Sequence, residues 1–193
     1  REPYFLLQRI MVQYPDSLMA NLANLLLIYQ QASRGDHVNA YYDLLSLRKK
    51  FNETPFSNSL HLLEAEMALM ANRLDDAERL LADPILSAAS LKPLQQLRQA
   101  DLLAARNDKT KALAIYLDLS GRTSLLENDP MSLARFADCL YIAKRYPEAA
   151  KRYQRLCDLL TSRPGMDLAL FRLAMSQSRL PNMAKRTRID LQQ

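Results

Sequence analysis

The sequence predicts an all-α fold, an α-solenoid of stacked antiparallel helix pairs, and three observations favour it. First, alanines recur at intervals of 37, 35, 37 and 35 residues, the spacing of a repeated two-helix unit; they are Ala40, Ala77, Ala112, Ala149 and Ala184. Second, the 193 residues include only three glycines, and 49% of them are hydrophobic, which suits helices around a continuous core. Third, valine occurs only at positions 12 and 38, and no segment alternates apolar and polar residues over the length of a strand.

The first element is a lone leading helix, expected over residues 3–13. Pro15 ends it, because the residue before a proline is driven out of helical geometry. Ser17 or Asp16 can then cap the next helix, since a short polar side chain accepts a hydrogen bond from the first free backbone N–H groups. A helical segment therefore precedes the first complete pair.

Five helix pairs follow, each with a short polar break between its helices. Gly35 lies in the break of the first pair, and Asp36 is expected to cap that pair's second helix. Asp129 and Pro130 open the fourth pair, an acidic cap followed by a proline where no N–H is needed. A longer connection is expected over residues 121–128. The expected pairs span residues 17–51, 58–82, 93–119, 130–161 and 166–193.

This alternation resembles the tetratricopeptide repeat (TPR) family over nearly the whole chain. The residues that carry the resemblance best lie in the fourth pair: Leu133, Phe136, Ala137, Leu140, Tyr146, Ala149 and Tyr153. The resemblance implies a right-handed superhelix in which small residues let paired helices approach closely. It also implies that the first helix of each pair lines a concave groove where peptides bind.

The chain also departs from the family pattern. Alanine replaces the family's glycine at Ala65, Ala100 and Ala137, the first pair has Ile28 there, and the usual tryptophan is absent. We therefore expect irregular links and some distortion of the superhelix. The link at residues 14–17, followed by an Ala/Leu-rich helix, is similar to bacterial cell-envelope members of the family. The compartment stays open between periplasm or cell envelope and cytoplasm.

Aligning the repeats on their alanines places Glu66, Asp101 and Asp138 at one position of three successive first helices, with Tyr29 and Leu173 at the same position of the first and last. We predict that a groove binds an extended or helical segment carrying apolar anchors and a Lys or Arg. The alternative is that these carboxylates pair with neighbouring Arg or Lys and the leucines fill the core between repeats. The predicted groove residues are Tyr29, Leu62, Glu66, Leu69, Leu97, Asp101, Asp138 and Tyr141.

No catalytic, cofactor-binding or metal-binding residues are predicted. The two histidines, His37 and His61, do not lie beside a cysteine, and no His, Cys and Asp cluster has metal-ligand spacing. The sequence contains neither a glycine-rich phosphate loop nor a nucleophile elbow. Cys139 and Cys157 read as small buried thiols, with one bridge between them as the alternative.

The net charge of +5 is unevenly distributed. Residues 1–96 carry 9 Lys/Arg and 11 Asp/Glu, whereas residues 97–193 carry 17 and 10. The basic half could bind nucleic acid or an anionic surface, but its charges are scattered along helices, so a solvated face is favoured over a nucleic-acid groove. No run of 18 apolar residues predicts a membrane span.

The function predicted from these observations is a non-catalytic scaffold that binds a protein or peptide. Two alternatives remain, a polyanion binder and a module that assembles with further copies of itself. The chain opens at Arg1 and stops inside an expected helix at Gln193, so we read it as a single repeat domain cut from a longer protein.

Overall fold

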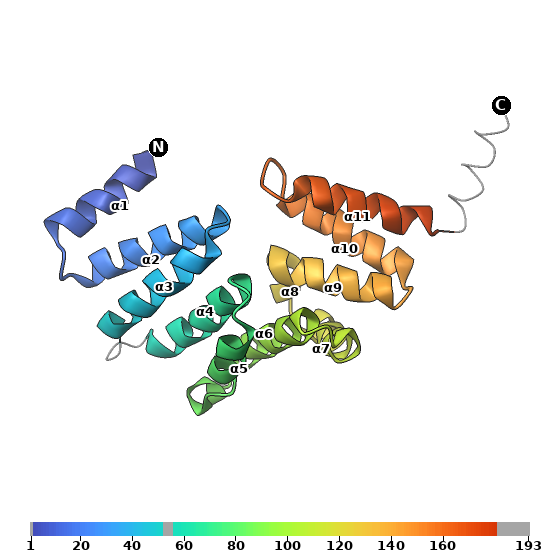
Figure 1. Cartoon of the computed structure of the whole chain (residues 1–193), viewed down its shortest axis with the longest axis horizontal. Coiled ribbons are helices and arrows are strands. Elements are labelled where there is room, and N and C mark those ends of the chain that lie inside the picture. The colour runs from blue at the N-terminus through green and yellow to red at the C-terminus, as the bar shows by residue number, and fades with distance from the viewer. Residues whose placement is uncertain (1, 52–55, 181–193) are drawn as a thin grey trace. The chain divides into compact units, whose positions relative to one another are not determined.

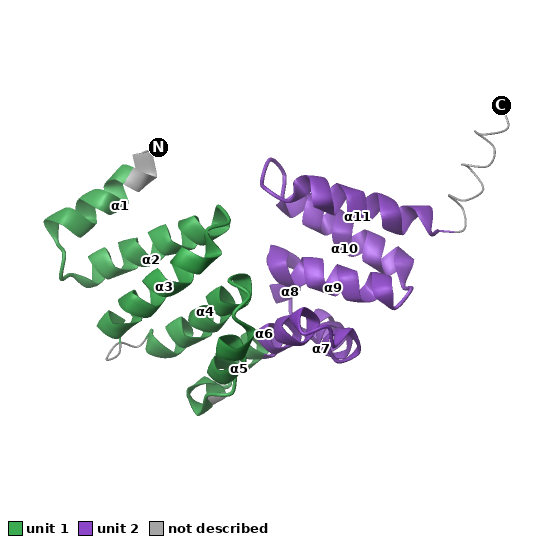
Figure 2. Cartoon of the chain, viewed as in Figure 1, with its two compact units in different colours: residues 1–95 green, residues 96–193 purple. Residues whose placement is uncertain are grey.

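The computed structural model describes residues 2–51 and 56–180 (Figure 1). The described residues form helices and turns without a strand, and within each unit most helices pack on their neighbours in the chain. The predicted all-α fold is confirmed, whereas its arrangement as a solenoid stays a prediction. The chain divides into two compact units, Arg1–Gln95 and Gln96–Gln193 (Figure 2), each described by itself below. The prediction of one continuous domain is not tested by this division.

Unit 1 begins with the expected lone helix and continues with two helix pairs. The first helix packs on the second, and each later helix packs on the one before it. Its elements are α1 (Glu2–Gln13), α2 (Leu18–Ser33), α3 (His37–Arg48), η1 (Lys49–Phe51), α4 (Ser57–Met70), α5 (Leu74–Leu81) and η2 (Pro84–Ser87). Ala40, Ala65 and Ala77 are fully buried, which fits the close packing of helices.

Unit 2 holds the remaining elements, with Tyr116, Phe136 and Tyr153 as its largest buried side chains. The elements are α6 (Lys92–Ala105), which starts just before the division, α7 (Lys109–Arg122), α8 (Leu125–Asn128), α9 (Pro130–Ile142), α10 (Tyr146–Leu159) and α11 (Met166–Ser178). One turn of helix, α8, occupies the connection expected over residues 121–128. The helix expected from residue 182 onward lies outside the described residues.

Ser17, Asp36 and Asp129 occupy the predicted N-cap positions, and Ser17 and Asp129 also make the side-chain hydrogen bond of a cap. The Ser17 hydroxyl accepts from the backbone N–H of Ala20 at 3.0 Å, and the Asp129 carboxylate accepts from the N–H of Ser132 at 3.1 Å. Asp36 occupies the predicted N-cap position of α3, but its side chain makes no cap hydrogen bond. It accepts instead from the side-chain amides of Asn39 and Gln31, at 2.9 and 3.0 Å, and these bonds lower the pKa of Asp36.

Each first helix that leads into a described hairpin ends in the same way. The second residue after its end has a left-handed backbone with φ between +57° and +96°; these residues are Gly35, Asn72, Asn107 and Lys144. The next N–H donates to the carbonyl five residues earlier: Asp36 to Gln31 (3.3 Å), Arg73 to Ala68 (2.8 Å), Asp108 to Leu103 (2.9 Å) and Arg145 to Leu140 (2.9 Å). This is the Schellman helix ending, which closes free carbonyls and reverses the chain. In each hairpin one of the periodic alanines lies five residues after the left-handed residue.

Candidate partner-binding surfaces

The predicted groove residues of unit 1 differ widely in accessibility. Tyr29 on α2 is half exposed and Glu66 on α4 is half-buried, whereas Leu62 and Leu69 on α4 are buried. Leu62 and Leu69 were predicted as groove contacts, and their burial corrects that prediction. Both belong to the apolar face with which α4 enters the core, so a partner cannot reach them.

In unit 2, Leu97 and Asp101 on α6 are buried as well, while Asp138 and Tyr141 on α9 are half-buried. The prediction of an exposed contact is corrected for Leu97, which fills core, and for Asp101, which is fully enclosed. Only Asp138 and Tyr141 among the four remain accessible to a partner.

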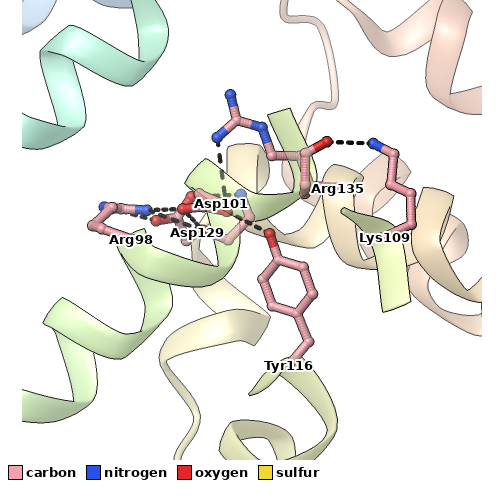
Figure 3. Close-up of polar contacts among 8 residues, drawn as sticks. Arg98, Asp101, Lys109, Tyr116, Asp129 and Arg135 are labelled. Carbon is pink, nitrogen blue, oxygen red and sulfur yellow. Dashed lines mark hydrogen bonds and ion pairs between the residues drawn. The ribbon is translucent and has the colours of Figure 1, made fainter. Parts of the chain in front are cut away.

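Asp101 lies at the centre of a buried polar network that joins three helices (Figure 3). Its Oδ2 accepts from Arg98 Nη1 at 2.9 Å and from Ser132 Oγ at 2.8 Å, and its Oδ1 accepts from Tyr116 Oη at 2.7 Å. Arg135 Nη1 lies 3.8 Å from the same Oδ1. The carboxylate therefore ties α6 to α7 through Tyr116 and to α9 through Ser132 and Arg135.

Arg98 extends this network to a second carboxylate. Its Nη1 donates to Ser132 Oγ at 2.9 Å, and its Nη2 lies 2.6 Å from Oδ2 of Asp129, the residue that caps α9. Two guanidinium groups thus face two carboxylates. Burial raises the pKa of Asp101, while Arg98 and Arg135 oppose that rise. The network is an internal brace between helices, and it matches the alternative in which carboxylates pair with neighbouring Arg.

The same three-residue arrangement occurs again 37 residues later, but open to solvent. Tyr153 Oη donates to Asp138 Oδ1, and Arg172 Nε lies 4.0 Å from that oxygen. The side chains of Asp138 and Arg172 are 39% and 44% exposed, against 0% and 22% for Asp101 and Arg135. The Tyr153 hydroxyl therefore holds the Asp138 carboxylate in place, and the carboxylate remains exposed to solvent.

Large apolar side chains lie close in sequence to both members of this ion pair. Tyr141 and Ile142 follow Asp138 by three and four residues on α9, so they lie on the same side of that helix. Phe171 precedes Arg172 on α11; it and Ile142 are both exposed. We call these five residues, Asp138, Tyr141, Ile142, Phe171 and Arg172, the Asp138 surface.

A second exposed patch lies on α2 in unit 1. This 16-residue helix has no charged residue, and its outward face carries Met19, Leu26 and Tyr29, which are 64%, 58% and 50% exposed. Leu22 lies between them and is half-buried. We call Met19, Leu22, Leu26 and Tyr29 the α2 stripe. Sequence reasoning placed Tyr29 among the groove residues and Leu22 beside it, and the lack of charge on this helix was a further signal.

The groups that could carry chemistry are dispersed or enclosed. His61 is buried 3.5 Å from Asp83, and His37 lies at the start of a different helix. Across the described residues, no group of three or more His, Cys, Asp or Glu could hold a metal ion. Cys139 and Cys157 are both free and buried, so the alternative of a bridge between them is wrong. Burial raises the pKa of both thiols, that of Cys139 to about 11.

Many of the basic side chains of unit 2 have acidic neighbours. Besides the two arrangements above, the ion pairs are Lys111–Asp108, Arg122–Asp118, Arg145–Glu148 and Arg152–Glu127. These pairs neutralise only part of the charge, because residues 97–193 carry 17 Lys/Arg and 10 Asp/Glu. The choice between a solvated face and a polyanion-binding face stays a prediction.

Comparisons with protein-family models, curated proteins and solved structures found no match to this chain. Within residues 2–51 and 56–180, no helix combines the length and the apolar character needed to cross a bilayer.

Proposed function

We propose that the chain is a non-catalytic protein-protein interaction scaffold, and that unit 2 binds a peptide or protein segment at the Asp138 surface. The observation that carries the proposal is the contrast between two equivalent Asp–Tyr–Arg arrangements. Around Asp101 the arrangement is sealed and balanced, whereas around Asp138 it is half exposed beside exposed apolar side chains. If the Asp138 arrangement only held helices together, the exposure of its carboxylate to solvent would add nothing to that role.

The chemistry of the Asp138 surface favours a basic residue next to an apolar one. Tyr153 fixes the carboxylate, while Arg172 Nε sits at 4.0 Å, beyond hydrogen-bond distance. A guanidinium or ammonium group of a partner can therefore hydrogen-bond the carboxylate directly. Ile142 and Phe171 expose apolar area to water in the free protein. Apolar side chains of a partner that pack on them would supply most of the affinity. The charge would set orientation and the rate of encounter.

The proposal includes a TPR-like, right-handed α-solenoid as the architecture. Helices that pack consecutively, Schellman endings at 35- to 37-residue intervals and buried alanines between paired helices support it. The non-catalytic part of the proposal is supported by the state of the reactive groups. The two thiols are buried with raised pKa values, and Asp101 is committed to its arginines.

Selection of random peptides displayed on phage against the whole chain tests the proposal. Enriched peptides should combine Lys or Arg with a large apolar residue. Isothermal titration calorimetry should then give their Kd for the original chain and for two variants, Asp138→Ala and Asp118→Ala. Asp138→Ala should raise Kd by about tenfold, the cost of a charge-assisted hydrogen bond. The matched control Asp118→Ala removes an exposed carboxylate paired with Arg122 on α7 and should leave Kd unchanged.

Two outcomes would contradict the proposal. In one, no peptide is enriched on the whole chain. In the other, the enriched peptides bind the Asp138→Ala variant as tightly as the original protein, so that their site lies elsewhere.

A further inference from the structure

We propose that the partner residue held at Asp138 is an arginine, whose guanidinium takes there the place that Arg98 takes at Asp101. This inference rests on the proposed function and narrows it, because the charge of the carboxylate alone would accept a lysine as well. The reason for arginine lies in the enclosed site (Figure 3), which displays within the same unit the donors that the open site lacks.

The carboxylate of Asp101 has a different set of neighbours on each oxygen. Oδ1 accepts from Tyr116 Oη at 2.7 Å and lies 3.8 Å from Arg135 Nη1. Oδ2 accepts from Arg98 Nη1 at 2.9 Å and from Ser132 Oγ at 2.8 Å. The Oδ1 side therefore consists of a tyrosine with an arginine close by, and the Oδ2 side consists of a guanidinium and a hydroxyl.

Asp138 repeats the Oδ1 side of this arrangement and lacks the Oδ2 side. Its Oδ1 accepts from Tyr153 Oη and lies 4.0 Å from Arg172 Nε. Within residues 2–51 and 56–180, the hydrogen bonds and ion pairs of Asp138 all involve Oδ1, so Oδ2 accepts from no neighbour there. A carboxylate offers about four lone-pair positions, and most of them stay open at Asp138.

The repeat alignment explains why Oδ2 of Asp138 has no donor. At the position 37 residues after Ser132 the chain has Ala169, which carries no hydroxyl. The counterpart of Arg98 at the same interval is Arg135, and its guanidinium lies beside the carboxylate of the preceding repeat. One Oδ2 donor is therefore missing because of its residue type, and the other because its side chain points elsewhere.

A guanidinium suits this carboxylate better than an ammonium group does. Its N–H groups lie in one plane, so one nitrogen can donate to Oδ2 while a second stays within reach of the remaining lone pair of Oδ1. A guanidinium is also weakly hydrated, and its flat face packs on aromatic rings. Tyr141 follows Asp138 by about one turn of α9, which brings such a ring to the same side of the helix.

Exposure to water lets the site hold a second arginine beside Arg172. In the enclosed cluster the charge of Arg98 is balanced by Asp129, which lies 2.6 Å from its Nη2. The counterpart of Asp129 is Met166, so the open site has no second carboxylate at that position. Solvent takes over its role, because the side chains of Asp138 and Arg172 are 39% and 44% exposed and repulsion between exposed charges is screened.

Peptides selected on the whole chain test the inference. After correction for codon frequency, arginine should occupy one fixed position in these peptides more often than lysine. Synthetic peptides should then be compared by isothermal titration calorimetry, with that arginine kept or replaced by lysine or by citrulline, an uncharged analogue of nearly the same shape. Each replacement should raise Kd by at least about tenfold, the cost of a lost hydrogen bond to a charged group.

The variant Asp138→Asn locates the contact. It keeps an oxygen that can accept from Tyr153 and replaces the other oxygen by an NH₂ group, which donates and so cannot receive a guanidinium. The arginine peptide should lose at least about tenfold in Kd on this variant, whereas the citrulline peptide should lose less than about twofold. The matched control Asp118→Asn changes an exposed carboxylate of α7 and should affect neither peptide. Circular dichroism should show that both variants keep their helices.

The outcomes separate this inference from the proposed function. If lysine serves as well as arginine in peptides that still need Asp138, the inference is overturned and the proposed function stands. The same holds if the arginine and citrulline peptides lose equally on Asp138→Asn, because the guanidinium then contacts another group. If no peptide is enriched, or if the enriched peptides ignore Asp138, the proposed function is overturned and this inference with it.

Discussion

Replacing Asp101 by alanine should strongly destabilise unit 2. The carboxylate accepts from Arg98, Ser132 and Tyr116, and it lies 3.8 Å from Arg135. Because Asp101 is fully buried, its removal leaves the Tyr116 hydroxyl and one N–H group of Arg98 without this acceptor, in a place that water does not reach. In the variant, the buried guanidinium groups of Arg98 and Arg135 therefore keep only one of their two carboxylate partners.

Breaking a buried ion pair by removing one partner costs about 3–5 kcal/mol. Asp129 still neutralises Arg98 through its second nitrogen, so the lower end, about 3 kcal/mol, is expected for Asp101→Ala. Tyr116→Phe removes one hydrogen bond from the same carboxylate and should cost about 1 kcal/mol. Asp118→Ala breaks an exposed pair with Arg122 and should cost less than about 1 kcal/mol.

Hydrogen exchange followed by mass spectrometry is the assay of choice, because it reports the stability of unit 2 separately from that of unit 1. Amides of α6, α7 and α9 should exchange faster in Asp101→Ala, and urea denaturation should show a lower midpoint. If Asp101→Ala and Asp118→Ala cost the same, or if Asp101→Ala costs less than about 1 kcal/mol, the network is not the brace described here.

Three further predictions follow from individual residues. Lys144→Gly should stabilise the chain by up to about 1 kcal/mol in urea denaturation, since glycine adopts a left-handed backbone without the side-chain clash that lysine suffers; Asn72→Gly should gain less, because asparagine tolerates that conformation. Cys139 and Cys157 should react with a thiol reagent at neutral pH at least about a hundredfold more slowly in the folded chain than in denaturant, and equal rates would contradict their burial. Burial beside Asp101 raises the pKa of Tyr116 well above 10.0, so the folded state keeps a proton that the unfolded state releases; stability should fall as pH rises past about 10, and less steeply in Tyr116→Phe.

The helix pairs could be predicted because their signals are local. The alanine spacing, the polar breaks and the caps at Ser17 and Asp129 each depend on residues within one or two turns. Asp36 takes its predicted N-cap position, but the partners of its side chain were not predicted. Its carboxylate accepts from the side-chain amides of Gln31 and Asn39, and sequence alone does not rank these donors against the backbone of α3.

The candidate site could be predicted only in part. Repeat alignment gave Asp101 and Asp138 the same role, and both lie in an Arg-x-Ala-Asp segment, yet one is enclosed and the other half exposed. That difference comes from tertiary packing, because Ser132 and Asp129 complete a shell around Asp101 and Arg98. The recurrence of arginine three residues before each aspartate was a readable sign that these carboxylates have partners within the chain.

The four Schellman endings bear on how the chain acquires its fold. Each reversal is specified by about six consecutive residues, and its hydrogen bonds join residues no more than five positions apart. A helical hairpin can therefore start to form while the rest of the polypeptide is still unstructured, and most of its closing contacts are near in sequence, which favours rapid folding. It also follows that a hairpin could be deleted or duplicated as a cassette, since the direction of the chain on either side is decided within the cassette itself.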